Sequence, residues 1–253
     1  SNNTGVCVYE RQKVKSPEII VKNEGGCISF IDRKTGKTLL RDVARESEPV
    51  VQERIVYDDA TAHMEETANG KVTVKDIIRR DTIGESTRYI SHFSCPDTKA
   101  LYGLGAHMED YMNLVGKTMW LTQHNLKVMI PVLMSPQGYG LLFDAGCAMK
   151  YSSDGKGFTM QMEAAKQIDY YFIKGDRMED IVEGYRYLTG RVQLLPLYAF
   201  GYIQSKERYV SSDDLINTLR EYRRRHVPVD MIVQDWNYWP EGWGYMKMNR
   251  KYY

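Results

Sequence analysis

The chain has 253 residues, of which 43% are hydrophobic, and its 34 Lys and Arg against 33 Asp and Glu give a formal charge of +1. This composition excludes disordered, collagen-like and coiled-coil chains, and the length fits one large domain or two small ones. With no basic block beyond residues 223–225, the near-neutral chain offers no surface for a phosphate backbone, so we predict no nucleic-acid partner. Apolar runs such as Val128–Met134 are far shorter than the roughly 20 residues of a membrane-spanning helix, so we expect no membrane segment.

Up to about residue 175, short segments of alternating or β-branched residues are separated by turn residues, a pattern that predicts β-strands. The predicted strands are Val6–Tyr9, Glu18–Lys22, Cys27–Ile31, Val50–Tyr57, Val72–Ile77, Tyr89–Phe93, Lys127–Met134, Tyr139–Asp144, Met149–Ser152, Phe158–Glu163 and Ile168–Ile173. Since no helical period separates them, the pattern predicts an antiparallel β-sandwich rather than βαβ units.

The hydrophobic pattern changes at Asp176. Apolar residues then recur at helical spacing as far as Leu188. Asp176 is the expected N-cap of this helix, and Gly190 is expected to end it in a left-handed conformation. We therefore predict an N-terminal sandwich domain over residues 1–190 and a second domain over residues 191–253.

The second domain has the pattern of one βαβ unit. We predict an apolar strand over Tyr198–Ile203, a helix from about Ser212 that Pro228 stops, and a strand over Val229–Val233. The last strand is apolar enough to be buried on both faces, as in parallel sheets. A closed (β/α)8 barrel needs about 250 residues, so we expect only the first βαβ unit of an incomplete barrel. The fold class is thus mainly β.

The densest cluster of aromatic and polar side chains comes directly after this last strand. It contains Asp235, Trp236, Trp239 and Trp243. Residues beyond the carboxyl end of a parallel strand face the ligand crevice, and flat rings beside a carboxylate suit a sugar. Lys206 follows the first strand of the unit and belongs to the same face. The alternatives are that the tryptophans fill the barrel mouth or the interface with the sandwich, and that Lys206 makes a surface salt bridge.

Several further motifs, in a consistent order, resemble glycoside hydrolase family 31. Those of the second domain are residues 201–206 (GYIQSK), 222–230 (YRRRHVPVD), 232–236 (IVQDW) and 242–244 (GWG). Upstream, residues 101–105 (LYGLG), 113–117 (NLVGK), 130–132 (IPV) and 138–144 (GYGLLFD) are similar to the sandwich that precedes the barrel in that family. The resemblance covers roughly residues 95–250 and is strongest to bacterial α-xylosidases and related α-glucosidases.

The resemblance implies a galactose-mutarotase-like β-sandwich followed by the start of a (β/α)8 barrel. It also implies a retaining α-glycosidase that hydrolyses terminal α-linked xylose or glucose from oligosaccharides without a metal or organic cofactor. Asp235 would bind sugar hydroxyls, with Trp236, Trp239 and Lys206 as the other candidate substrate-binding residues. Retaining hydrolysis needs a nucleophile and an acid/base carboxylate, and in this family both lie on later barrel strands. We therefore expect no catalytic residue in this chain, and an inactive chain when it is alone.

Two other interpretations remain open. One is a noncatalytic carbohydrate-binding or interaction module whose functional part is the sandwich. The other is one chain of a split enzyme, in which a second copy or a partner chain completes the barrel. The chain begins at Ser1 without a methionine, and its four cysteines have no CxxC spacing, so the sequence leaves both a periplasmic and a cytoplasmic location in a bacterium open.

Overall fold

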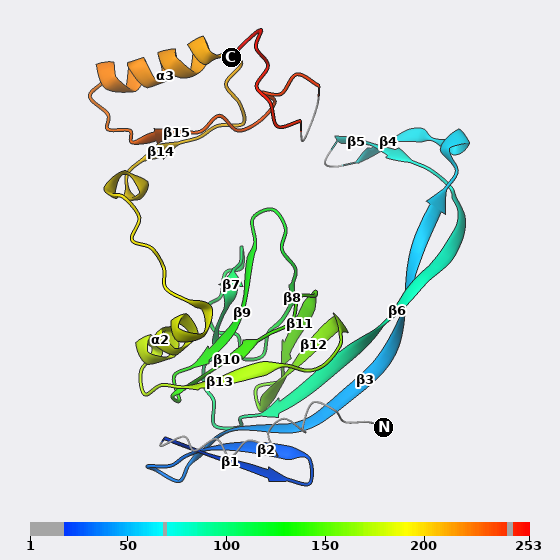
Figure 1. Cartoon of the computed structure of the whole chain (residues 1–253), viewed down its shortest axis with the longest axis vertical. Helices are drawn as coiled ribbons and strands as arrows, with labels where there is room; N and C mark the ends of the chain where they lie inside the picture. Colours follow the sequence, from blue (N-terminus) through cyan, green and yellow to red (C-terminus); the bar gives the residue numbers. More distant parts are fainter. Residues whose placement is uncertain (1–17, 68–69, 242–244) are drawn as a thin grey trace. The chain divides into compact units, whose positions relative to one another are not determined.

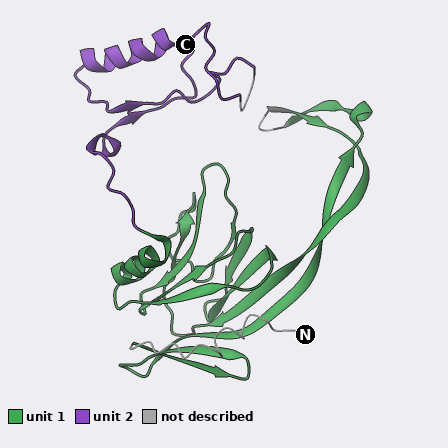
Figure 2. Cartoon of the chain, viewed as in Figure 1, with its two compact units in different colours: residues 1–190 green, residues 191–253 purple. Residues whose placement is uncertain are grey.

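The computed structural model describes residues 18–67, 70–241 and 245–253. The chain divides into two compact units, residues 1–190 and 191–253 (Figures 1 and 2). The predicted strand Val6–Tyr9 lies outside the described residues. In the described part, no helix is both long enough and apolar enough to cross a lipid bilayer.

The described residues of the first unit form two antiparallel sheets and a small hairpin. The larger sheet has the order β1 (Ile19–Glu24), β2 (Cys27–Asp32), β3 (Thr38–Tyr57), β6 (Ile77–Ser94), β12 (Gly157–Ala165), β11 (Met149–Ser153), β8 (Thr118–Leu121). The smaller sheet has the order β13 (Tyr170–Lys174), β10 (Tyr139–Phe143), β9 (Val128–Ser135), β7 (Tyr102–Ala106). The predicted mainly β, antiparallel fold is confirmed.

The core of this unit is formed by side chains from both sheets. In β12, Phe158 and Met160 are buried while the residues on either side of them are only half-buried, which is the period of a strand with one face in the core. The ring of Phe93 in the larger sheet makes an edge contact with Phe143 in the smaller one, at 5.9 Å between centroids. Such aromatic contacts between sheets are expected to fix how the two sheets pack.

Strands β3 and β6 continue beyond their neighbours as a two-stranded arm (Figure 1). Their pairing runs from Arg41 opposite Ser94 to Tyr57 opposite Ile77. The sequence predicted a strand only over Val50–Tyr57 here, so the strand was found but it is much longer than predicted. Charged residues occupy both faces of the arm and hide the alternation by which a half-buried strand is recognised.

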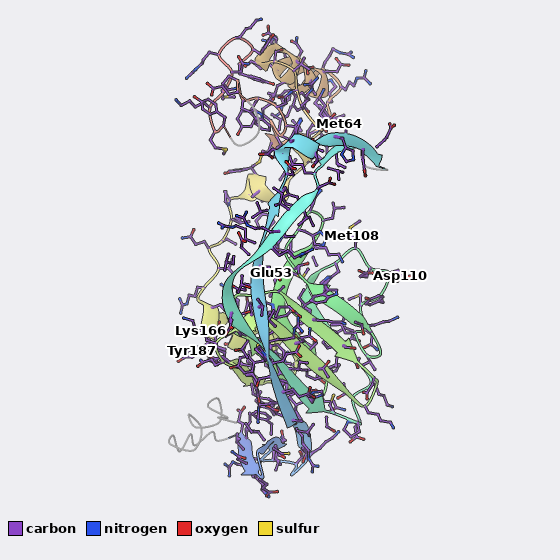
Figure 3. The ribbon with its side chains drawn as sticks, turned by 90° about the vertical axis from the view of Figure 1, so that its right-hand side faces the viewer. Glu53, Met64, Met108, Asp110, Lys166 and Tyr187 are labelled. Carbon is purple, nitrogen blue, oxygen red and sulfur yellow. The ribbon has the colours of Figure 1, made fainter. Side chains whose placement is uncertain are left out.

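Cross-strand ion pairs line the arm where the core does not reach. On the arm, Arg80 lies 3.4 Å from Glu53. At its base, Arg88 of β6 pairs with Glu48 of β3 and with Glu163 of the neighbouring β12. The arm leads to the 3-10 turn η2 (Asp59–Thr61) and to a hairpin of β4 (His63–Thr67) and β5 (Gly70–Val74). Figure 3 shows Glu53 on the arm and Met64 on this hairpin. The predicted strand Val72–Ile77 is divided between β5 and β6.

Helix α2 (Met178–Thr189) contacts β13, β10 and β9 and buries Ile181. The predicted N-cap, Asp176, was wrong. The N-cap is Arg177, whose backbone N–H donates to the Asp180 carboxylate at 2.9 Å, while Asp176 pairs with Lys174. Gly190 ends the helix with a φ of +94°, in the half of backbone space that favours glycine.

Cys27, Cys95 and Cys147 are free thiols, and Cys7 lies outside the described residues. Only Cys95 of these three is fully buried, and its burial raises the pKa of the thiol. The other two thiols are only half-buried.

The second unit contains η3 (Leu197–Phe200), β14 (Ile203–Gln204), α3 (Ser212–Arg224) and β15 (Met231–Ile232), with β14 and β15 parallel. The predicted helix from Ser212 is confirmed, but both predicted strands were too long, and residues 197–200 form a 3-10 turn. The expected burial of the second strand on both faces was also wrong, because Met231 is 37% exposed. A two-stranded sheet with one helix has too few neighbours to cover its strands.

Candidate functional site

The predicted sugar-binding residues lie in the second unit, where two parallel strands lead into neighbouring segments. Lys206 follows β14, and Asp235 and Trp236 follow β15. The backbone N–H of Trp236 donates to the carbonyl of Glu207 at 3.0 Å. This hydrogen bond joins the two segments, so the structure brings the loop of Lys206 beside the segment of Asp235.

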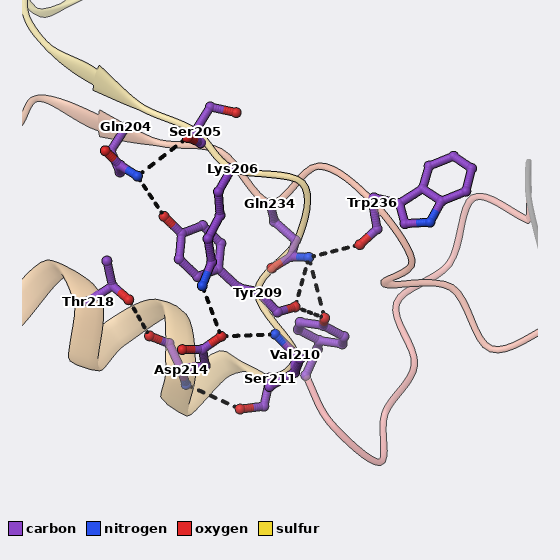
Figure 4. Close-up of polar contacts among 11 residues, drawn as sticks. Gln204, Ser205, Lys206, Tyr209, Val210, Ser211, Asp214, Thr218, Gln234 and Trp236 are labelled. Atoms are coloured by element: carbon purple, nitrogen blue, oxygen red, sulfur yellow. Dashed lines mark hydrogen bonds and ion pairs between the residues drawn. The ribbon is translucent and has the colours of Figure 1, made fainter. Parts of the chain in front are cut away.

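Lys206 is engaged with its own loop and with helix α3 (Figure 4). Its Nζ lies 3.6 Å from Oδ2 of Asp214 and 4.3 Å from the ring centroid of Tyr209. Asp214 belongs to the first turn of α3, where it accepts a hydrogen bond from the N–H of Val210 at 3.1 Å and donates its own N–H to the hydroxyl of the N-cap Ser211. These contacts fit the alternative salt-bridge role of Lys206, and any contact with a sugar stays a prediction.

Asp235 has an exposed side chain. Among the described residues, its carboxylate has no hydrogen-bond or ion-pair partner. The neighbouring acids differ: Asp214 is used at the helix start, and Asp230 accepts a hydrogen bond from the N–H of Tyr202 at 3.2 Å. The oxygens of Asp235 are therefore open to accept hydrogen bonds from an incoming hydroxyl.

The aromatic cluster after β15 forms a small packed group. The rings of Trp236 and Trp239 meet edge to face, with centroids 5.1 Å apart and planes at 81°. Tyr238 packs against Trp239 at 5.2 Å. Asn237 makes the turn between the tryptophans with a φ of +59°, a value that Asn tolerates better than most residues. Trp243 and its flanking glycines lie outside the described residues.

Two glutamines of this unit were not among the predicted site residues. Oε1 of Gln204 accepts hydrogen bonds from the hydroxyls of Tyr202 and Tyr222, at 2.5 and 2.6 Å. The side chain of Gln234 lies between the two segments that hold Lys206 and Asp235 (Figure 4). A glutamine at the end of an otherwise apolar strand is the only sequence signal for Gln234, and its partners are far away along the chain.

Chemically, this arrangement is suited to binding a polyol. A carboxylate can accept hydrogen bonds from hydroxyls, and indole rings can pack on the C–H faces of a sugar. In the part of the chain that the structure describes, no group of three or more His, Cys, Asp or Glu side chains is arranged to hold a metal ion.

The match to a known protein family begins at the boundary between the two units of the chain. Residues 192–253 match the model of the glycosyl hydrolases family 31 TIM-barrel domain. An α-xylosidase of Saccharolobus solfataricus is 37% identical over 205 residues, which are 72% of this chain and 28% of that protein. An uncharacterized family 31 glucosidase of Pseudescherichia vulneris is 28% identical over 148 residues, which are 58% of this chain and 28% of that protein. Residues 192–253 belong to glycoside hydrolase family 31.

Solved structures of this family have the same fold. The family 31 α-xylosidase of Xanthomonas citri superposes on 94% of this chain with a TM-score of 0.74 and 20% identity, over 40% of its own length. A family 31 α-xylosidase from a soil metagenome, complexed with xylose, covers 88% of this chain at a TM-score of 0.67 and 28% identity, over 32% of its own length. The fold is therefore a family 31 sandwich followed by the start of the (β/α)8 barrel. The chain spans about 28% of the length of the first two curated relatives.

Proposed function

We propose that this chain supplies the β-sandwich domain, residues 1–190, and the opening of the catalytic barrel, residues 191–253, of a retaining α-glycosidase. The substrate is an oligosaccharide with a terminal α-linked xylose or glucose. The observation that carries the proposal is the carboxylate of Asp235, which has no partner among the described residues and follows the second parallel strand inside the region that matches the family's barrel domain. Asp235 accepts hydrogen bonds from sugar hydroxyls, and Trp236 and Trp239 shape the pocket. Lys206 flanks it from the loop after the first strand.

Removing the Asp235 carboxylate is expected to weaken sugar binding by at least about tenfold, because a hydrogen bond to a charged group contributes roughly 1.5–3 kcal/mol. The measurement is a titration of the chain with methyl α-xyloside and methyl α-glucoside, followed by tryptophan fluorescence, for the wild type and Asp235→Ala. The matched control is Asp213→Ala, which removes an exposed carboxylate from the same unit, at the start of α3. Equal affinities for all three proteins would refute the assignment of Asp235.

We further infer that residues 1–253 do not hydrolyse glycosides by themselves. The double-displacement reaction needs a nucleophile and a proton donor about 5–5.5 Å apart, and we assign both to later strands of the barrel. The expected result is no turnover of aryl α-xyloside or aryl α-glucoside by the purified chain. Turnover that persists through repurification and is lost in Asp235→Ala would contradict this inference.

Exposed apolar side chains of the second unit suit a barrel completed by further strands. Leu194 is 94% exposed and Leu197 is 88% exposed. Covering such side chains is favourable by about 25 cal/mol per Å². The covering strands come from the same polypeptide, or from a partner chain or a second copy in a split enzyme. Measuring the oligomeric state of residues 1–253 by light scattering separates self-association from the other two arrangements.

The second candidate function is a noncatalytic carbohydrate-binding module, and Trp120 favours it. This residue on strand β8 is 48% exposed, with Nζ of Lys150 at 5.5 Å from its ring centroid. Two positions along the same strands, and therefore on the same face, the hydroxyls of Thr118 and Ser152 lie 2.7 Å apart. Sugar binding that is indifferent to Asp235→Ala and lost in Trp120→Ala would favour this function over the crevice.

A further inference from the structure

The side chain of Gln234 connects three parts of the second unit that are distant in the sequence. Its Nε2 lies 3.3 Å from the carbonyl oxygen of Tyr209, 3.3 Å from the hydroxyl of Tyr253 and 3.5 Å from the carbonyl oxygen of Trp236 (Figure 4). The hydroxyl of Tyr253 donates its own hydrogen to the same carbonyl of Tyr209. One amide group thus holds the loop after β14, the segment after β15 and residue 253 together.

These contacts fix which way the amide points. Two of the three neighbours of Nε2 are carbonyl oxygens, which can only accept, and the hydroxyl of Tyr253 has given its hydrogen to Tyr209. The NH2 end of the Gln234 amide must therefore face them. Oε1 of Gln234 is turned into the interior, where it has no hydrogen-bond partner among the described residues.

The segments that Gln234 joins are themselves well ordered. Tyr209 is completely buried. The N–H of Tyr253 donates to the carbonyl of Asn249 at 2.9 Å, and the N–H of Asn249 donates to the carbonyl of Tyr238 at 2.7 Å. The side chain of Gln234 is therefore hydrogen-bonded to residues that are themselves held in place. These bonds fix the backbone directly before Asp235.

We propose that Gln234 is a positioning residue that holds Asp235 in place for sugar binding. Asp235 lies between two anchored neighbours: the side chain of Gln234 is bound to Tyr209, and the N–H of Trp236 is bound to the carbonyl of Glu207 at 3.0 Å. The backbone of Asp235 is thus fixed while its carboxylate stays exposed. Burying Oε1 with no hydrogen-bond partner among the described residues lowers stability. The side chain is therefore better explained by its role in positioning Asp235 than by a contribution to stability. This inference rests on the proposed function.

The variant that tests the proposal is Gln234→Glu, which keeps the size of the side chain but removes the donating NH2 group at neutral pH. The matched control is Gln204→Glu in the same unit. Oε1 of Gln204 accepts from the hydroxyls of Tyr202 and Tyr222, and a carboxylate still accepts both. Its Nε2 lies 3.4 Å from the Tyr209 hydroxyl, which can turn to donate to a carboxylate, and 3.4 Å from the carbonyl oxygen of Ser205, a long contact that the control variant loses. A second variant, Tyr253→Phe, removes one partner of Gln234 with little change of shape.

The first measurement is amide hydrogen exchange of Trp236, whose N–H donates to the carbonyl of Glu207, in the full 253-residue chain. We expect Gln234→Glu to lower its protection factor by about tenfold or more at pH 7, Tyr253→Phe to lower it less, and Gln204→Glu to leave it unchanged. Protection in α3 should be the same in all variants, which shows that the unit is folded. Near pH 4 the introduced carboxyl, with an ordinary pKa of about 4.3, regains one donor, so part of the protection should return.

The second measurement is the affinity for methyl α-xyloside and methyl α-glucoside. Positioning predicts an affinity at least about tenfold lower in Gln234→Glu and unchanged in Gln204→Glu. Unchanged exchange at Trp236 overturns the proposal whatever the sugar affinity. Reduced protection with unchanged affinity also overturns it, because Gln234 is then only structural. If the wild type binds neither sugar, the proposed function fails, while exchange still decides whether Gln234 holds Asp235.

Discussion

Replacing Gly105 by Ala is expected to destabilise the sandwich by about 3 kcal/mol or more, because strain and overlap act together at this position. Gly105 has a φ of +104°, which side chains disfavour, and it lies at an irregular point in the pairing of β7 with β9. An added Cβ would stand 1.9 Å from the carbonyl oxygen of Val128 and 2.8 Å from the nitrogen of Ile130. Both are backbone atoms of a paired strand, which cannot move aside as a flexible side chain can.

The measurement for this prediction is urea unfolding followed by far-UV circular dichroism. Gly116→Ala is the matched control. Gly116 also has a positive φ, of +72°, but no atom lies within 4 Å of the position of its added Cβ. It should therefore lose only about 1–2 kcal/mol from the left-handed conformation. Equal losses in the two variants would show that backbone conformation alone, and not the close approach of β9, sets the cost at Gly105.

The sequence predicted the sandwich best where strands have one face in the core. Phe158–Glu163 was predicted and β12 covers Gly157–Ala165, since the apolar residues of that strand alternate with polar ones. The arm formed by β3 and β6 could not be predicted in the same way. Its order depends on pairs such as Arg80 with Glu53, which are 27 residues apart in the chain, and no local pattern reveals such partners.

The candidate site, too, could be predicted only where the local sequence carries a signal. A polar residue at the carboxyl end of an apolar strand is visible in the sequence, so Asp235 and Trp236 were placed correctly after a strand of the βαβ unit, although their binding role stays a proposal. The ends of the strands were not predicted, because Val229–Val233 is apolar throughout and only Met231–Ile232 finds a partner strand. The connection from Gln234 to Tyr253 depends on how the last residues fold back, and local composition does not contain that information.

Removing the carboxylate of Asp42 is expected to destabilise the first unit by about 3–5 kcal/mol, the range for breaking a buried ion pair. Asp42 in β3 is completely buried, and its Oδ2 accepts hydrogen bonds from the hydroxyl of Tyr170 at 2.7 Å and from Nη2 of Arg45 at 2.6 Å. Asp42→Ala removes the carboxylate that accepts from the Tyr170 hydroxyl and that neutralises the Arg45 guanidinium. Asp42→Asn keeps an acceptor for both groups and should lose less. The free energy of unfolding in urea is the measurement for both variants.

The contribution of Asp42 to stability should also depend on pH, and the burial of its carboxyl group sets the direction of this dependence. Burial raises the pKa of Asp42 in the folded chain, outweighing the hydrogen bond from Tyr170 and the charge of Arg45. The folded state then binds its proton more tightly than the unfolded state, in which the pKa is about 3.9. The stability that Asp42 contributes is therefore complete below that value and falls as the pH rises through the folded pKa. The stability difference between wild type and Asp42→Ala should be larger at pH 4 than at pH 7. A stability difference that grows with pH would mean that the charge of Arg45, and not the burial of Asp42, determines the direction in which the pKa of Asp42 is shifted.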